Sequence, residues 1–447
     1  MTNAVYWFSN DLRLADNPAL QRAVHSEDRL SFVYCLDPAL LRPNHFNCTG
    51  LGKHRHRFII EALTDLDKQL KHHGQHLSVY YQNPRQVFTE LYEKHQVRRI
   101  YHSVNAGYNE QQFFSHIAAT TDTSVTAVHS HTLFEPADLP FMLTDLPETF
   151  SKFRRLIEKD QRPLLPAGKA PGQLPPALYK PFNWLKVLRE PESGSDPRFN
   201  GGETAGQKHL NDYFTQPHAQ TYKETRNALD NWAHSTKFSA WLAAGCISPR
   251  QVMSALQQHE TRYGANDSTY WIFFELLWRE YFQWYAHVHG SKLFQFRGIN
   301  GINNHKPLTS FYPERFQRWC HGNTPYPIVN ACMKQLNATG YMSNRGRQLV
   351  ASCFIHELQL DWRYGAAYFE QQLIDYDVAS NWGNWQYLAG VGADPRGSRR
   401  FNLDKQTQTY DPEGEFIRAW RGETDGRNQN IDSVDAADWP IAPGKRH

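Results

Sequence analysis

The chain has 447 residues, of which 40% are hydrophobic. It contains 48 basic and 45 acidic side chains, which gives a net charge of +3. A chain of this length is too long to fold around one ordinary hydrophobic core, so the length predicts two domains. The near-neutral balance excludes a general polycation, so any nucleic-acid site must be a local patch.

Three patterns bear on location and metal content. The segment MTNAVYWFSNDLRL lacks the basic and apolar parts of a signal peptide, and no apolar run is long enough to span a membrane. The six cysteines lack CxxC spacing, which is typical of reduced, buried thiols. The histidines at 54–56 and 72–73 lie among Arg, Lys and Gln without metal-ligand spacing, which favours a solvated helix surface over zinc. We therefore expect a cytoplasmic chain with no metal site and no membrane contact.

Residues 1–135 alternate short apolar runs with amphipathic segments. This alternation predicts an α/β domain with a doubly wound, Rossmann-like parallel sheet. No GxGxxG motif occurs here, which argues against a dinucleotide in this half. Asp16 or Asn17 is expected to cap the first helix, with Pro18 in its first turn. The expected strands are 4–8, 30–36, 76–81 and 97–103, and the clearest helices are 53–72 and 84–95.

The rest of the chain changes character twice. Residues 136–202 are rich in proline and glycine, which predicts an interdomain connector with one helix near 147–159. Residues 203–424 carry a helical pattern and predict an all-α domain. Residues 425–447 form a polar tail that is expected to be ordered only in part.

The segment 235–239 places hydroxyls and an ammonium group in a turn that opens a helix. Such a turn offers backbone N–H groups and side-chain donors to a phosphate. An ordinary N-cap is the alternative interpretation. The residues are Ser235, Thr236, Lys237, Phe238 and Ser239.

The apolar helix at 273–285 carries polar groups on one face. Glu275, Trp278 and Arg279 have i, i+3, i+4 spacing. Burying a carboxylate and a guanidinium is costly unless they have partners. The pattern is compatible with an internal Glu275–Arg279 ion pair and with groups presented to an external partner.

A second face is predicted within 376–387. Asp377, Asn381 and Trp385 are spaced i, i+4, i+8 and would share one face if this segment is helical. A carboxylate, an amide and an indole suit a planar, redox-active heterocycle, since the first two address its polar edge and the indole lies within electron-transfer reach. A core helix with an aromatic stripe is the alternative.

The order of the motifs between 341 and 387 is specific. SNRGRQ at 343–348, DW at 361–362, DYD at 375–377 and SNWGNW at 380–385 resemble the photolyase/cryptochrome family, and more narrowly its DASH cryptochromes. The segment at 7–20 resembles the opening motif of the family's N-terminal domain, and the segment at 149–159 resembles the DASH branch. The resemblance implies an N-terminal antenna domain and an all-α, FAD-binding C-terminal domain.

The resemblance also implies which residues hold the FAD. The family's phosphate-binding turn falls on residues 235–239, Tyr222 matches a flavin contact upstream, and Arg279 would face the flavin. The implied cofactor-binding residues are Tyr222, Ser235, Thr236, Lys237, Phe238, Ser239, Glu275, Arg279, Asn344, Arg347, Asp375, Tyr376, Asp377 and Asn381.

A second chromophore is implied at the edge of the sheet. In family members with a folate antenna, an acidic residue near this point binds the pterin, and Glu110 is the matching position. The candidate is 5,10-methenyltetrahydrofolate. An acid favoured at a helix start by the macrodipole is an equal alternative.

The resemblance implies a lesion pocket in DNA repair. Glu275 would hydrogen-bond a thymine pair and Trp278 would stack on it. Asn344 replaces a histidine of the branch that repairs (6-4) photoproducts, which favours cyclobutane dimers, while Gln348 and Tyr387 make the pocket more polar than in duplex-specific relatives. A solvated loop is the alternative for the arginines of 394–401. The implied DNA-binding residues are Trp278, Arg345, Gln348, Tyr387, Arg396, Arg399 and Arg400.

The family passes electrons to the flavin along three tryptophans. Trp385 and Trp362 match the first two, whereas the usual third position is Thr309. The chain of donors therefore ends at two or leaves through Trp319 or Trp382.

Together the resemblance implies a DASH-type deoxyribodipyrimidine photo-lyase, in which reduced FAD absorbs blue light and transfers an electron to a cyclobutane pyrimidine dimer. The catalytic residues would be Glu275, Trp278, Asn344, Trp385 and Trp362. We expect a monomer that acts on single-stranded DNA, with RNA as a further candidate. A blue-light photoreceptor that signals through partner binding is the alternative function.

Overall fold

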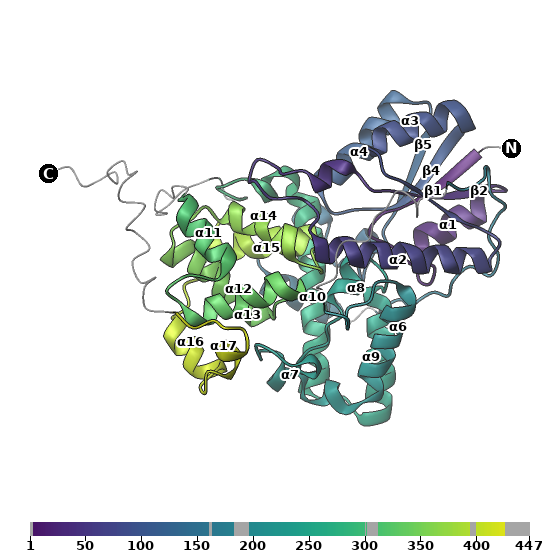
Figure 1. Cartoon of the computed structure of the whole chain (residues 1–447). Helices are drawn as coiled ribbons and strands as arrows, with labels where there is room; N and C mark the ends of the chain where they lie inside the picture. The colour runs from purple at the N-terminus through teal and green to yellow at the C-terminus, as the bar shows by residue number, and fades with distance from the viewer. Residues whose placement is uncertain are drawn as a thin grey trace.

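The computed structural model describes residues 3–160, 163–182, 196–299, 301, 312–393 and 399–424. A parallel sheet with its helices occupies one end of the molecule, and a larger helical region occupies the other (Figure 1). Thr309, Arg396 and the tail at 425–447 lie outside the described residues.

The N-terminal sheet has five parallel strands in the order β3-β2-β1-β4-β5. This arrangement confirms the predicted Rossmann-like fold. β5 is not predicted by the sequence, because its burial alternates irregularly and it lies at the sheet edge. The strands are β1 (Asn3–Phe8), β2 (Leu30–Cys35), β3 (Leu77–Tyr80), β4 (Val97–Ser103) and β5 (Ser124–Val128). The helices are α1 (Pro18–Ser26), α2 (Lys53–His72), α3 (Pro84–His95) and α4 (Tyr108–Thr120).

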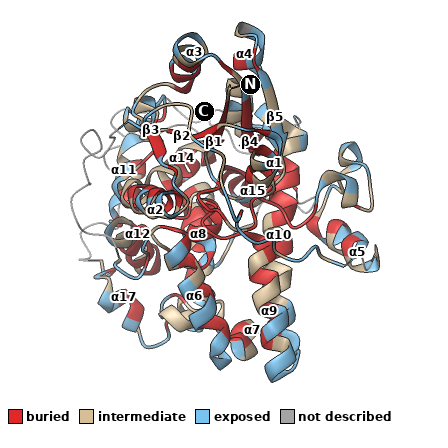
Figure 2. Cartoon of the chain, turned by 90° about the vertical axis from the view of Figure 1, so that its right-hand side faces the viewer, coloured by how far each residue is buried: buried red, intermediate tan, exposed pale blue. Residues whose placement is uncertain are grey.

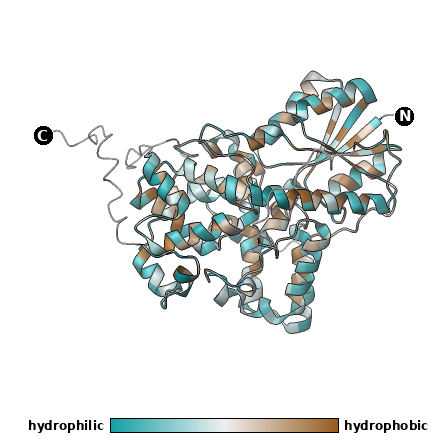
Figure 3. Cartoon of the chain, in the orientation of Figure 1, coloured by the Kyte–Doolittle hydropathy of each residue, from teal (hydrophilic) through white to brown (hydrophobic). Residues whose placement is uncertain are grey.

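Alternation along β1 divides the sheet between two cores. Tyr6 and Phe8 enter a large core with α1 and α2, whereas Val5 and Trp7 enter a smaller one with α3 and α4. The larger core continues without interruption into the helical region. Buried residues accordingly concentrate in the strands and in α10, and hydrophilic residues on the outer helices (Figures 2 and 3).

The helical region is built around α10 (Asp267–His289), which is buried along most of its length. Capping boxes begin both α9 and α10, through Ser248 with Gln251 and Asn266 with Thr269. The predicted connector helix is α5 (Phe150–Asp160). The other helices are α6 (Glu203–Thr215), α7 (Tyr222–Thr225), α8 (Ser239–Ala243), α9 (Pro249–Tyr263), α11 (Pro313–His321), α12 (Pro327–Thr339), α13 (Asn344–Ser352), α14 (Trp362–Gln372), α15 (Val378–Ala389), α16 (Leu403–Tyr410) and α17 (Glu415–Ala419).

The loop after β1 joins the two regions through buried charges. Arg13 donates to the carbonyls of Gly245 at 2.9 Å and Ser130 at 2.7 Å, and Glu203 accepts from the backbone of Leu14 at 2.7 Å. Charge-assisted bonds of this kind orient the helical region on the sheet. No helix within the described ranges is long and apolar enough to cross a membrane.

Of the two residues expected to cap the first helix, one does so. Asn17 accepts from Leu20 N at 3.1 Å and caps α1. Asp16 instead accepts from Gly168 N at 2.8 Å and Arg250 Nε at 3.1 Å.

Candidate cofactor and nucleic-acid site

A cavity of about 550 Å³ lies in the helical region, between α7, α8, α10 and α13. A smaller cavity of about 90 Å³ lies beside it, and the two share lining residues such as Asp377 and Asn344. The larger cavity brings together most residues expected to bind FAD or DNA. They are Tyr222, Ser235, Thr236, Lys237, Phe238, Ser239, Glu275, Trp278, Arg279, Asn344, Arg345, Arg347, Gln348, Asp375, Asp377, Tyr387 and Arg399.

The predicted phosphate-binding turn directly precedes α8. Lys237 has a left-handed φ of 54°, and its Nζ donates to Ser235 Oγ at 2.7 Å and Asn231 O at 3.1 Å. The buried ammonium also lies 5.1 Å from the centre of the Tyr341 ring. The turn therefore fixes a cation and hydroxyls at one end of the cavity, as a pyrophosphate requires.

A part-buried ion pair lies at the edge shared by the two cavities. Arg347 Nη2 donates to both carboxylate oxygens of Asp375, at 2.7 and 3.0 Å, and Arg347 Nε donates to Met342 O at 2.9 Å. The Asp375 side chain is 1% exposed. Each side chain thus holds the other in a fixed orientation at the cavity edge.

Asp377 occupies a different helical position from the predicted one. The helix α15 begins at Val378, so Asp377 is its N-cap and accepts from Ser380 N at 2.7 Å. The predicted helix 376–387 is therefore wrong at its start, because the carboxylate competes for the free N–H groups there. Gln283 Nε2 of α10 contacts both oxygens of Asp377, at 2.9 and 3.0 Å.

Asn381, Trp385 and Tyr376 line the smaller cavity. Asn381 Nδ2 donates to Ala366 O of α14 at 3.0 Å. The Tyr376 ring lies against Arg55 of α2, whose guanidinium carbon is 4.4 Å from the ring centre. Asn381 and Tyr376 therefore also tie α15 and its preceding loop to neighbouring helices.

Trp385 is 2% exposed and lies within an aromatic cluster. Its ring centre is 5.2 Å from Phe369, 5.7 Å from Phe354 and 6.2 Å from Trp319. Trp362 begins α14, lies 5.9 Å from Trp382, and lines neither cavity. The ring contacts of Trp385 thus lead to Trp319, whereas Trp362 and Trp382 form a separate contact.

On α10, Glu275 forms an ion pair with Arg226 of the segment after α7. The alternative of an internal Glu275–Arg279 pair is wrong, because Arg279 donates instead to His131 O. Burial in the cavity wall raises the pKa of Glu275, and the charge of Arg226 opposes this rise. The Arg226 guanidinium also lies 4.2 Å from the Trp271 ring centre.

Another wall residue of α10 is Trp278. It stacks on Phe150 of α5 at 3.8 Å, and Tyr387 approaches its edge at 5.8 Å. The Arg399 guanidinium lies 4.7 Å from the Tyr387 ring centre, and Arg345 Nη2 donates to Asn227 Oδ1 at 3.2 Å. One mouth of the cavity is thus aromatic and cationic, which suits bases and phosphates.

Besides Trp362, two predicted site residues among those described lie outside both cavities. Arg400 is held by both carboxylate oxygens of Glu357, at 2.9 and 3.0 Å, which offsets its charge toward DNA. Glu110 lies in the first turn of α4, where burial raises its pKa and the charge of Asp377 raises it further. Glu110 therefore lies near enough to Asp377 to sense its charge, yet it lines neither cavity.

Several cavity residues are not identified from the sequence. Arg226 follows Tyr222 by four residues, and Trp271 precedes Glu275 by four, so helical spacing is a usable signal for both. Gln283 supports Asp377 without lining either cavity, and it carries no such signal, because Asp377 is distant in sequence. Among the described residues, no group of three or more His, Cys, Asp or Glu side chains is arranged to hold a metal ion.

Comparisons with known proteins agree with this geometry. A family model for the FAD-binding domain of DNA photolyase matches residues 271–435, and a DNA photolyase model matches residues 4–172. A protein of Idiomarina loihiensis named Cryptochrome DASH is 53% identical over 446 residues, 98% of this chain and 96% of the relative. The chain belongs to the DASH cryptochromes.

A further DASH cryptochrome, from Vibrio parahaemolyticus, is 52% identical over 98% of this chain and 97% of its own length. The crystal structure of a Synechocystis cryptochrome superimposes with a TM-score of 0.88 at 39% identity, covering 94% of this chain and 88% of that one. This DASH cryptochrome is therefore a flavoprotein with an FAD-binding domain, within a family of photolyase-like enzymes that act on DNA.

The residues present fit an FAD. The cation and hydroxyls of the 235–239 turn suit its phosphates, and the fixed carboxylate of Asp377 with the amide of Asn381 suits the polar edge of a flavin ring. The roles of single residues in this fit remain predictions.

Proposed function

We propose that this DASH cryptochrome repairs cyclobutane pyrimidine dimers under blue light, preferentially in single-stranded DNA. One observation carries the proposal. Glu275 and Trp278 line the same cavity as Lys237 and Asp377. A lesion at the first pair and a cofactor at the second would thus share one cavity, which shortens the path of an electron between them.

Bound FAD would supply the electron, and the protein would supply geometry and polarity. Lys237 and the neighbouring hydroxyls would hold the phosphates, while Asp377, kept in place by Gln283, would address the flavin ring. Glu275, oriented by Arg226, would hydrogen-bond the dimer, and Trp278, backed by Phe150, would stack on it.

The strand preference follows from the energetics of flipping. A dimer must leave the base stack to enter this cavity, which costs a few kcal/mol and least in a single strand. Aromatic stacking would return about 1–3 kcal/mol per base. Gln348 and Tyr387 line the cavity with polar groups. With polar rather than apolar side chains at these two positions, the cavity would offset less of the cost of opening a duplex.

Three further expectations belong to this proposal. Glu110, in the first turn of α4, is the candidate ligand of a folate antenna. We also propose domain boundaries at residues 135, 202 and 424, and a monomeric state. A cytoplasmic location would suit the six cysteines, which are all unpaired.

The deciding experiment compares initial repair rates under the same light. One oligonucleotide containing one dimer is presented single-stranded and then annealed to its complement. We expect much faster repair of the single strand. Equal rates would defeat the strand preference, and no repair of either would favour a photoreceptor. On single strands, log affinity should fall with log salt at about −0.7 per phosphate contact.

A further inference from the structure

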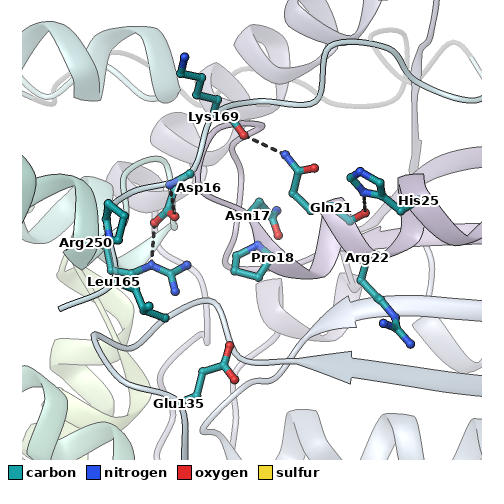
Figure 4. A pocket seen from close by; sticks show the side chains of 12 residues that line it. Asp16, Asn17, Pro18, Gln21, Arg22, His25, Glu135, Leu165, Lys169 and Arg250 are labelled. Carbon is teal, nitrogen blue, oxygen red and sulfur yellow. Dashed lines mark hydrogen bonds and ion pairs between the residues drawn. The ribbon is translucent and has the colours of Figure 1, made fainter. Parts of the chain in front are cut away.

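A second cavity lies at the junction between the sheet and the helical region, away from the residues assigned to FAD and DNA. Its volume is about 640 Å³, and it is lined by α1, the connector at 165–169 and the start of α9. Figure 4 shows that side chains from these three segments surround it.

The floor of this junction cavity holds a buried cation. Arg250 is 6% exposed, and its Nε donates to Asp16 Oδ2 at 3.1 Å. Its two Nη atoms have no partner among the described residues, and they point toward Pro18 and the open volume (Figure 4). A guanidinium offers a planar fork of donors, so unused Nη groups in a concave site suit a carboxylate or a phosphate.

The connector forms a fixed wall of this cavity. Gly168 N donates to Asp16 Oδ1 at 2.8 Å, and Gln21 Nε2 of α1 donates to Lys169 O at 2.8 Å. These bonds hold Leu165 and Pro166 over the volume, where with Pro18 they form an apolar surface. Leu165 is 51% exposed, so much of its apolar side chain is open to a ligand in the cavity.

The rim carries exposed charged side chains of both signs. Arg22 and Lys169 are exposed and form no ion pair with any described residue. Glu135 also lines the cavity and lies too far from Arg250 to form an ion pair. The unpaired cations therefore outnumber the unpaired anion, and Glu135 is placed to accept a hydrogen bond from a donor group on a ligand.

We propose that the junction cavity binds a small organic anion, with its carboxylate or phosphate on Arg250 and its apolar body on Pro18 and Leu165. The site is separate from the proposed repair reaction and does not depend on it. Because Arg250 and Asp16 also join the two regions, an occupied site would stabilise the junction.

Binding is tested by calorimetry on the FAD-loaded protein, so that the FAD phosphate site is already filled. The three probes are inorganic phosphate, phenyl phosphate and benzoate. We expect phenyl phosphate or benzoate to bind at least tenfold more tightly than inorganic phosphate, and their order identifies the anionic group. Absence of saturable binding by both aromatic probes would overturn the proposal.

The site is located by the acetylation rate of Lys169, measured by mass spectrometry of peptides. The better probe should slow acetylation of Lys169 but not of Lys68, an exposed lysine on α2 that lies outside the cavity. Equal rates with and without the probe would overturn the assignment.

Arg250→Gln should weaken the better probe at least tenfold. Loss of Arg250 removes a partner of Asp16 and with it a contact that supports folding. A variant of the cavity rim therefore tests binding independently of Arg250. Arg22→Gln combined with Lys169→Gln should weaken binding about threefold or more, with Lys68→Gln as the control. Unchanged affinity in the rim variant would contradict the proposal.

Discussion

Gly365 of α14 lies directly against the indole of Trp385 of α15. A Cβ atom at residue 365 would come within 2.3 Å of Trp385 Cη2. Only glycine permits this approach, because a real side chain would push the indole or the helix away. The position of Trp385 at the smaller cavity therefore depends on a residue in another helix.

Gly365→Ala is expected to destabilise the protein by about 1–3 kcal/mol, the usual cost of overpacking a core. It should also reduce retained FAD, since the displaced indole lines the cavity. Urea unfolding and flavin content measure the two effects. Gly172→Ala is the control, because a Cβ there meets no atom within 4 Å. Equal stability of the two variants would show that α14 and α15 separate at little cost.

Trp385→Phe is expected to lose most of the light-driven reduction of oxidised FAD by an external thiol. The indole is the tryptophan side chain that lines the smaller cavity, and phenylalanine is much harder to oxidise. Absorbance of the oxidised flavin during illumination measures the effect. Unchanged photoreduction would refute Trp385 as the direct donor.

The second electron donor is distinguished by two further variants. Trp319 lies 6.2 Å from Trp385, whereas Trp362 contacts Trp382 at 5.9 Å. If the expected route is used, Trp362→Phe will slow photoreduction more than Trp319→Phe. The reverse order would assign the route to Trp319. Thr309→Val should be neutral, since threonine is not usefully oxidised.

Glu275→Ala is expected to slow dimer repair by roughly tenfold to a hundredfold while leaving FAD bound. A hydrogen bond to a charged group contributes about 1.5–3 kcal/mol, and each 1.4 kcal/mol is about tenfold in rate. Arg226→Gln removes the ion pair but keeps the carboxylate. Single-turnover repair should be faster in Arg226→Gln than in Glu275→Ala. Equal rates would mean that Glu275 acts only through its partner.

Acid sensitivity should depend on His102 of β4. The imidazole is 3% exposed, stacks on Phe114 at 3.4 Å, and its Nε2 has no hydrogen-bond partner among the described residues. Burial lowers the pKa of His102 to about 4. The unfolded chain therefore binds this proton first, so stability present above pH 6.5 is lost as pH falls toward 4, by about 1.4 kcal/mol per pH unit or ~3 kcal/mol in all.

His102→Phe keeps the ring stack but removes the titration. The variant should lose less stability than the parent chain between pH 7 and pH 4.5, as measured by urea unfolding at both values. His25→Phe, at an exposed position of α1, is the control and should follow the parent chain. Parallel stability curves for all three proteins would contradict the assignment.

Local features of this protein follow from the sequence. The helices α2 and α3 span the predicted residues. The position of a helix depends on hydrophobic periodicity and on capping residues next to it in the sequence. The motif order between 341 and 387 likewise points to the cofactor-binding domain, since its residues must face one ligand. The start of α15 differs because Asp377 caps that helix through Ser380 N.

Partners that are distant in sequence are decided only by the tertiary structure. Spacing on α10 puts Glu275 near Arg279, yet the crossing of α7 brings Arg226 to Glu275 instead. Asp377 meets Gln283 for the same reason. The helical period determines which residues are neighbours within one helix. Contacts between helices depend instead on crossing angles and on the paths of the loops, and one apolar pattern is compatible with many such arrangements.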